Sequence, residues 1–234
     1  MNDNLGYKIL WLFILFAIYF GYNYYFSEID NNEADISYVD SDIPNYSDKD
    51  LIILNNNEPD FDDLAKTSES FEVYSELDSL GRTGVAYANL GKELMPTSER
   101  KNISMVKPTG WNYSKYDFIE GNLLYNRCHL IAFSLAGENA NPNNLITCTR
   151  HMNAEVMLKY ENKVGNYIRK TNNHVLYRVT PVYDGNNLLA KGVQMEALSV
   201  EDNGKGIKFN VFIYNVEPKV EINYTDGSNK LTED

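Results

Sequence analysis

The sequence predicts a mixed α+β domain that follows an N-terminal transmembrane segment. Three observations support this prediction. A long apolar stretch without charge lies near the N-terminus, a strongly acidic segment follows it, and the remainder alternates short strand patterns with one amphipathic helical pattern. At 234 residues the chain has room for one domain of ordinary size and these two additional segments.

The N-terminal stretch has the length and composition of a membrane span. Residues 9–20 are all apolar or aromatic, and no charge follows until Glu28. The uncharged stretch at residues 9–26 is close in length to the ~20 residues that cross ~30 Å of hydrocarbon. The exit side is rich in tyrosine, as at a membrane interface, and lacks the small residues of a signal-peptide cleavage site. We therefore expect an uncleaved signal anchor at residues 1–26, in preference to a buried core helix.

The flanking charges predict the orientation of this anchor. Lys8 precedes the apolar stretch, and acidic residues crowd its other end. Because positive charge favours the cytoplasmic side, the N-terminus is expected in the cytoplasm and the body of the chain outside, as a single-pass protein of the cell membrane. Cleavage of the anchor would instead give a secreted protein.

Most of the negative charge lies in one segment. Residues 27–70 contain 13 acidic and two basic residues, against a formal net charge of −12 for the whole chain. Such a composition buries too little apolar surface to offset the entropy of ordering, so we expect an acidic, disordered linker. Its one apolar island, at residues 51–55, could dock on the domain. Since the acidity is local, the net charge does not exclude a nucleic-acid partner.

From Phe71 onward, strand patterns alternate with loops. Residues 71–91 indicate two short strands around a turn at residues 80–84. A polar segment that holds the most basic part of the molecule follows at residues 92–115. The C-terminal part again has strand patterns, at residues 174–200, with a turn at 184–187, and at residues 206–224.

A strand–loop–strand–helix unit is predicted between these regions. Residues 123–133 form a mostly apolar strand pattern, residues 137–144 a loop of turn formers, and residues 144–149 a second short strand. Residues 150–171 have apolar side chains at helical spacing. This unit contains both cysteines and two of the three histidines, so the candidate chemistry concentrates here.

The cysteines do not form a persuasive catalytic or zinc site. Cys128 and His129 are sequence neighbours on a strand and point to opposite faces, so they cannot form a thiolate–imidazole pair with each other. The spacing of the cysteines and histidines also lacks the patterns of zinc sites. Cys128 and Cys148 could form a disulfide in an extracellular domain, or remain as two buried thiols. The residues alone leave both alternatives open.

His129 and Arg127 lie two residues apart and so share one face of the strand. An imidazole is the most common general base near neutral pH, and a guanidinium can neutralise phosphate. The asparagine-rich loop could supply the side-chain oxygen that a hydrated Mg²⁺ requires. The pairing suits a phosphodiester site, although a lone strand histidine is more often structural.

Several motifs together resemble the bacterial DNA/RNA non-specific endonucleases of the ββα-metal fold. They include "YNRCHLIA" at 125–132, "NNLITCTRHMN" at 143–153 and "MLKYENKV" at 157–164. The chain is most similar to the membrane-anchored or secreted DNA-entry type nucleases of Gram-positive bacteria. The resemblance implies a ββα-metal (His-Me finger) domain with a central antiparallel sheet over residues 71–225, followed by a polar tail at 226–234.

The resemblance also implies site residues. His129 matches the general base that activates water, and Asn153 matches the single protein ligand of a hydrated Mg²⁺, for which Mn²⁺ could substitute. Glu161 matches an acid that orients water on the metal. Asn144 matches an asparagine that helps place the histidine or the phosphate, and Arg127 matches the arginine of the motif.

Further cations are candidate substrate contacts, although arginine and lysine in polar segments often serve only solubility. The candidates are Arg82, Arg100, Lys101 and Lys107. The motif itself departs from the Asp-Arg-Gly-His of the family at two positions, where this chain has Asn126 and Cys128.

The expected function is that of a membrane-anchored extracellular endonuclease that depends on Mg²⁺ and hydrolyses DNA or RNA with little sequence preference. No obligate protein partner is expected. Two alternatives are a non-catalytic surface module that binds DNA for uptake and a secreted nuclease toxin of the same chemistry.

Overall fold

The computed structural model describes residues 43–62 and 65–232. The expected signal anchor at residues 1–26 and the first part of the expected linker lie outside the described residues. Within the part of the chain that is described, no helix is both long and apolar enough to cross a bilayer.

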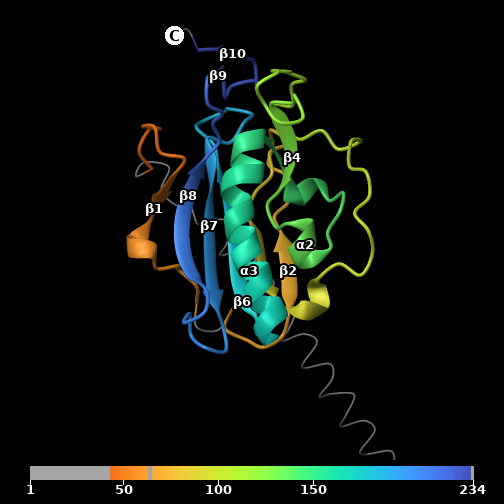
Figure 1. The fold of residues 1–234 in the computed structure, drawn as a ribbon, viewed down its shortest axis with the longest axis vertical. Helices are drawn as coiled ribbons and strands as arrows, with labels where there is room; N and C mark the ends of the chain where they lie inside the picture. The colour runs from red at the N-terminus through yellow and green to blue at the C-terminus, as the bar shows by residue number, and fades with distance from the viewer. Residues whose placement is uncertain (1–42, 63–64, 233–234) are drawn as a thin grey trace, which may run out of the picture. The chain divides into compact units, whose positions relative to one another are not determined.

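A six-stranded antiparallel sheet forms the centre of the fold (Figure 1). The strand order is β1-β8-β7-β6-β3-β2, in which β6, β7 and β8 follow one another along the chain as a meander. The prediction of a mixed α+β domain with a central antiparallel sheet is confirmed. The strands are β1 (Leu51–Ile53), β2 (Phe71–Tyr74), β3 (Ala86–Leu90), β6 (Val175–Val182), β7 (Gly192–Ser199) and β8 (Lys208–Tyr214).

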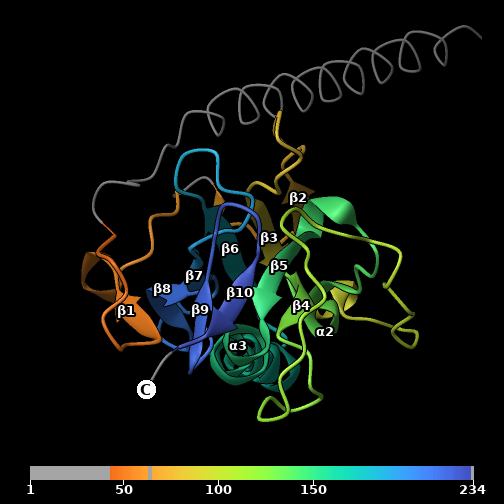
Figure 2. The same ribbon diagram turned by 90° about the horizontal axis from the view of Figure 1, so that it is seen from above.

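The predicted strand–loop–strand–helix unit is present beside this sheet (Figure 2). Two strands pair antiparallel as a separate sheet, and the helix begins directly after the second strand. Short helices complete the connections. The bounds are β4 (Tyr125–His129), α2 (Phe133–Ala136), β5 (Leu145–Thr149), a π-helical segment (Met152–Met157), α3 (Leu158–Thr171), and the 3-10 helices η1 (Asn55–Asn57), η3 (Lys92–Leu94) and η4 (Pro142–Asn144).

The helix α3 covers one face of the central sheet (Figure 1). Val164 and Ile168 on the helix are fully buried in one cluster with Tyr177 of β6 and Met195 of β7. Burial of a large apolar side chain stabilises a fold by about 1.5–3 kcal/mol, so this contact fixes the helix on the sheet. The helix in turn determines where the residues at its start lie relative to β4 and β5.

The other face of the sheet carries a buried ion pair among apolar side chains, and the segment before Phe71 contacts it. Arg178 of β6 forms an ion pair of 2.8 Å with Glu196 of β7, and Glu196 is 2% exposed. The backbone of Asp60 contacts both partners: its N–H donates to Glu196 over 3.0 Å, and its carbonyl accepts from Arg178 over 2.6 Å. These buried charges need such partners, because an unpaired buried polar group is costly.

The described part of the expected linker contacts the domain. The apolar island forms β1 at Leu51–Ile53 and extends the sheet by pairing with β8. The acidic composition did not prevent order, since this segment contacts the sheet through the backbone of Asp60 and through the ring of Phe61, which stacks on Tyr87.

The chain ends in a hairpin of β9 (Val220–Ile222) and β10 (Asn229–Leu231). The expected polar tail at residues 226–234 thus contains a paired strand. Tyr125 of β4 donates a hydrogen bond of 3.0 Å from its hydroxyl to the carbonyl of Gly227, so the hairpin also contacts the start of the predicted site strand.

Candidate active site

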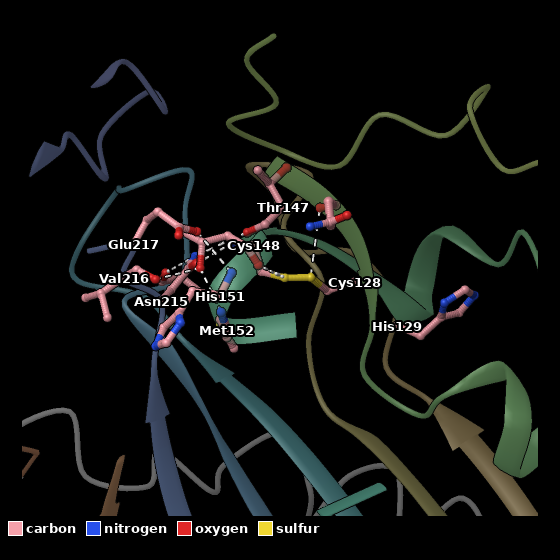
Figure 3. Close-up of a disulfide and its surroundings, with 12 residues drawn as sticks. Cys128, His129, Thr147, Cys148, His151, Met152, Asn215, Val216 and Glu217 are labelled. Carbon is pink, nitrogen blue, oxygen red and sulfur yellow. Dashed lines mark hydrogen bonds between the residues drawn. A yellow bond between two sulfur atoms is a disulfide. The ribbon is translucent and has the colours of Figure 1, made fainter. Parts of the chain in front are cut away.

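The β4–β5 hairpin carries the central histidine. In its register, His129 at the end of β4 lies opposite Leu145 at the start of β5. A disulfide joins Cys128 to Cys148 across the pair, with a Cα–Cα distance of 5.9 Å. Of the two alternatives left open by the sequence, the structure shows the disulfide. Figure 3 shows His129 directed away from it, as expected for neighbours on a strand.

The position of the helix start follows from the end of β5. Thr149 accepts a hydrogen bond of 3.0 Å from the backbone N–H of Met152 on its hydroxyl, which is the contact of an N-cap residue. Asn215, just after β8, accepts from the N–H of Thr149 over 2.9 Å. These bonds attach β5 and the helix start to the central sheet (Figure 3).

The surroundings of His129 determine its protonation. The side chain is buried, and its Nε2 lies 2.8 Å from the carbonyl oxygen of Asn139. A carbonyl only accepts, so Nε2 carries the proton and Nδ1 has the free lone pair in the neutral ring. Nη2 of Arg100 lies 3.4 Å from Nδ1. Burial lowers the pKa of His129, the Asn139 bond raises it, and the charge of Arg100 lowers it further. The net shift favours a neutral proton acceptor.

Glu161 lies in the same electrostatic environment. It is buried on α3, and burial raises its pKa to about 7, while the charge of Arg100 acts in the opposite direction. Arg100 is therefore a common neighbour of the histidine and the acid. The fully buried Tyr177 lies near Glu161, and burial together with the charge of Glu161 raises the pKa of Tyr177. Among the residues that the structure describes, its hydroxyl has no hydrogen-bond partner.

Asn144 is fully buried and holds the chain just beyond the histidine. Its side-chain oxygen accepts from the N–H of Ile131 over 2.8 Å, and its amide donates to the carbonyl of Ile131 over 2.9 Å. The backbone N–H of Leu130 donates to the Asn144 carbonyl over 2.9 Å. The side chain thus replaces a strand partner and fixes the backbone after His129.

Asn153 lies in the π-helical segment, half-buried, and no hydrogen bond of its side chain occurs within the described residues. π-helical turns are rare and are frequently found at functional sites. The rotation of about 80° that a regular helix would place between Asn153 and Glu161 does not hold across this segment. The sequence pattern did not indicate this irregularity.

The side-chain oxygen of Asn153 is a ligand of the kind that a hydrated hard cation accepts. No group of three or more histidine, cysteine or acidic side chains able to hold a metal is present in the described part of the chain. A sparse oxygen set is what Mg²⁺ accepts, because it retains several waters and needs one or two protein ligands. The unpartnered amide of Asn153 can supply such a ligand.

Arg127 does not point a free guanidinium toward a substrate. Its Nε donates to the carbonyl of Val106, and its Nη2 donates to that of Ser104 over 2.9 Å. Its Cζ also lies 3.9 Å from the ring centroid of Trp111. Burial lowers its pKa. These contacts join Arg127 to the preceding loop.

Arg82 is likewise committed to the fold. It forms an ion pair of 2.7 Å with Asp78 and donates to the carbonyls of Gly185 and Asn187. Its guanidinium also lies over the ring of Tyr183. These contacts explain Arg82 without a substrate.

Lys101 and Lys107 differ from Arg82, since both are exposed and neither side chain has a partner within the described residues. They remain available to a polyanion.

The comparisons with known proteins agree with this geometry. The family model for DNA/RNA non-specific endonucleases matches residues 63–201. This chain belongs to that family. A search of curated proteins finds no match.

Solved structures of bacterial nucleases are similar to this nuclease. NucA from Streptococcus agalactiae with a bound magnesium ion has 25% identity and a TM-score of 0.71, over 82% of this chain and 93% of that chain. The Sda1 nuclease with a bound zinc ion has 30% identity and a TM-score of 0.58, over 70% and 82%. An extracellular endonuclease with 18% identity shares the fold, with a TM-score of 0.56.

One contributor to the site of the nuclease was missed from the sequence. Asn139 acts through its backbone carbonyl, which holds Nε2 of His129, and through its side chain, which accepts from the N–H of Lys101 over 3.0 Å. A backbone carbonyl is present at every residue, so no sequence signal could have identified it. Only the clustering of asparagines pointed to this loop.

Proposed function

We propose that this nuclease is a membrane-anchored extracellular enzyme that hydrolyses phosphodiester bonds of DNA, and also of RNA, with His129 as general base and Asn153 as the ligand of Mg²⁺. The observation that carries the proposal is the orientation of His129. Its Nε2 is fixed by a carbonyl, so the Nδ1 lone pair, toward which Nη2 of Arg100 points, is the one that can take a proton. The bound magnesium in the NucA structure supports the choice of metal, for which Mn²⁺ could substitute.

His129 accepts the proton of the attacking water at Nδ1. Its Nε2–H bond to Asn139 stabilises the imidazolium that forms, because a carbonyl dipole favours the charged ring. The low pKa keeps the ring neutral before the reaction. General base catalysis of this kind contributes about 10²–10⁴-fold to a rate.

Arg100 faces Nδ1 across 3.4 Å, in the region that a scissile phosphate would occupy during the attack. Its guanidinium stabilises the charge that develops on the phosphoryl oxygens. Glu161, whose buried carboxyl lies within the field of Arg100, orients water in its charged form. Asn153 would hold the Mg²⁺ ion, which when bound would supply positive charge near the phosphate. Departure of the 3′-oxygen leaves 5′-phosphate ends.

The location is proposed from the sequence and the neighbours. Residues 9–20 have the composition of a membrane span, and similar structures include extracellular nucleases. A disulfide is also typical of a domain outside the cytoplasm. Fractionation of cells with and without residues 1–26 tests the anchor.

Supercoiled-plasmid digestion tests the catalytic proposal. The wild type is expected to cleave with Mg²⁺ and to stop with EDTA. Asn153→Ala should raise the Mg²⁺ concentration needed for half-maximal rate by about 10–100-fold, the cost of losing a metal-site contact. The matched control is Asn166→Ala, an exposed asparagine of the same helix. Metal-independent cleavage, or DNA binding without cleavage, would overturn the proposal, and the latter would favour a non-catalytic DNA-binding module.

A further inference from the structure

The loop at residues 98–110, here called the basic loop, has no helix or strand of its own. Loops of this length without regular structure are uncommon in compact domains and are usually functional. The basic loop carries Arg100, Lys101 and Lys107, and it brings Arg100 to His129. Contacts from the rest of the domain are needed to fix the basic loop beside His129, because ordering each backbone residue costs conformational entropy.

Two groups from the site hold the basic loop. Near its start, the backbone N–H of Lys101 donates to the side chain of Asn139. Near its middle, the guanidinium of Arg127 donates to the carbonyls of Ser104 and Val106. The planar fork of arginine suits two carbonyls at once, and a single ammonium does not.

The end of the loop closes over the same arginine. Trp111 follows the basic loop directly, and its ring lies against the guanidinium at 3.9 Å. Arg127 is therefore surrounded by the loop that it holds. It lies on β4 two residues before His129, so one strand supports both the base and the loop.

We propose that Arg127 is a positioning residue, which fixes the basic loop so that Arg100 faces His129 before the substrate arrives. The consequence for catalysis rests on the proposed function, whereas the ordering of the loop does not. Preorganisation of this kind reduces the entropy lost on binding. A displacement of about 1 Å in a reacting geometry can cost about a hundredfold in rate.

Two variants separate anchoring from phosphate binding. Arg127→Met removes the charge and the fork, and Arg127→Lys keeps the charge without the fork. If Arg127 acted as a phosphate contact, lysine would retain most of the activity. If it anchors the loop, both variants lose activity similarly, by about a hundredfold in kcat/KM. Substantial activity in Arg127→Lys with loss in Arg127→Met overturns the proposal.

Limited trypsin digestion gives a readout that does not depend on activity. Anchoring predicts that Arg127→Met and Arg127→Lys are cut after Lys101 much faster than the wild type, with cleavage sites identified by mass spectrometry. Arg169→Met is the control, since Arg169 is exposed and, within the described part of the chain, its side chain hydrogen-bonds only to Asn166 of its own helix. Unchanged cleavage after Lys101 would overturn the proposal, and it would do so even if the chain had no nuclease activity.

A double-mutant cycle tests whether Arg127 acts through Arg100. If it does, the double variant of Arg100→Met and Arg127→Met cleaves no more slowly than Arg100→Met alone. The reason is that the effects of substituting residues that act as one unit are not additive. If the losses multiply, Arg127 has an independent role and the proposal fails. Should the wild type itself not cleave, the proposed function fails while the proteolysis result still decides the anchoring.

Discussion

Two histidines of this nuclease lie in opposite electrostatic surroundings. His129 is buried between a carbonyl oxygen and a guanidinium, and its pKa is lowered, mainly by burial. His174 lies between Glu201, at 2.5 Å, and Glu93, at 3.2 Å. Burial lowers the pKa of His174, but the two carboxylates outweigh burial and the net shift is upward. A neutral imidazole can accept a proton, whereas a charged one serves as an ion-pair partner.

The comparison shows that neighbours, and not residue type, decide which histidine can act as a base. The partners of His174 come from η3 and from the turn after β7, so its role is to join distant segments. The partners of His129 come from two loops beside β4, and neither partner can take a proton from the ring. The predictions below test this contrast, beginning with the largest expected effect.

Alanine substitution of each histidine should have opposite consequences. His129→Ala should reduce kcat for plasmid cleavage by about 10²–10⁴-fold, as expected for loss of a general base. His174→Ala should cleave at nearly the wild-type rate and unfold more easily. Initial rates and urea unfolding of both variants give the answer. Comparable rates for the two variants would remove His129 from the mechanism.

The disulfide lies next to His129, because Cys128 precedes it on β4. It closes a loop with a sequence separation of 20, which contains Asn139 and Asn144. Replacement of Cys128 and Cys148 together by alanine should lower the free energy of unfolding by about 3 kcal/mol, from the chain entropy of a loop of this length. Urea unfolding with and without a reducing agent measures the effect. A variant as stable as the oxidised wild type would contradict this account, and the reducing agent should affect only the wild type.

His174 should make stability depend on pH. Its pKa is raised in the folded state, so its contribution is fully present below the pKa of about 6.5 in the unfolded chain and is lost as pH rises through the folded-state pKa. His174→Gln should therefore cost most at acidic pH, by about 1 kcal/mol, since Glu93 and Glu201 are partly exposed and screened.

Urea unfolding of the wild type and His174→Gln at pH 6 and at pH 9 measures the difference. The two proteins should approach each other at the higher pH. A difference in stability that is the same at both pH values would mean that the carboxylates do not act through the charged ring.

The elements of the fold were largely predictable, because their signals are local. The turns at residues 80–84 and 184–187 and the strand–loop–strand–helix unit appear where the hydrophobic patterns placed them. The order of residues 43–62 was not predictable, since these residues depend on Arg178 and Glu196, more than a hundred positions away. Composition indicates how much apolar surface a segment can bury by itself. It does not indicate which surface of the rest of the chain the segment can contact.

For the candidate site too, some features could be predicted from the sequence and others could not. The motif proposed roles for His129, Asn153 and Glu161, but it could not show what each arginine binds. Arg82 and Arg127 have the same chemistry as Arg100, and the structure assigns the first two to backbone carbonyls and the third to the histidine. Side-chain direction depends on tertiary contacts that no spacing rule contains.

The smallest expected effect concerns Arg100. Its positive charge beside His129 contrasts with the negative charges of Glu93 and Glu201 beside His174. Its charge lowers the pKa of both His129 and Glu161, so Arg100→Met should raise both. Both groups act in their deprotonated forms, and the acidic limb of kcat/KM should therefore move to higher pH. The limb reports the groups of the free enzyme. Lys101→Met is the matched control, because that side chain contacts neither group, and its limb should stay in place while its KM rises. A limb that stays in place or moves to lower pH in Arg100→Met would show that the guanidinium does not lower the pKa of the group that titrates.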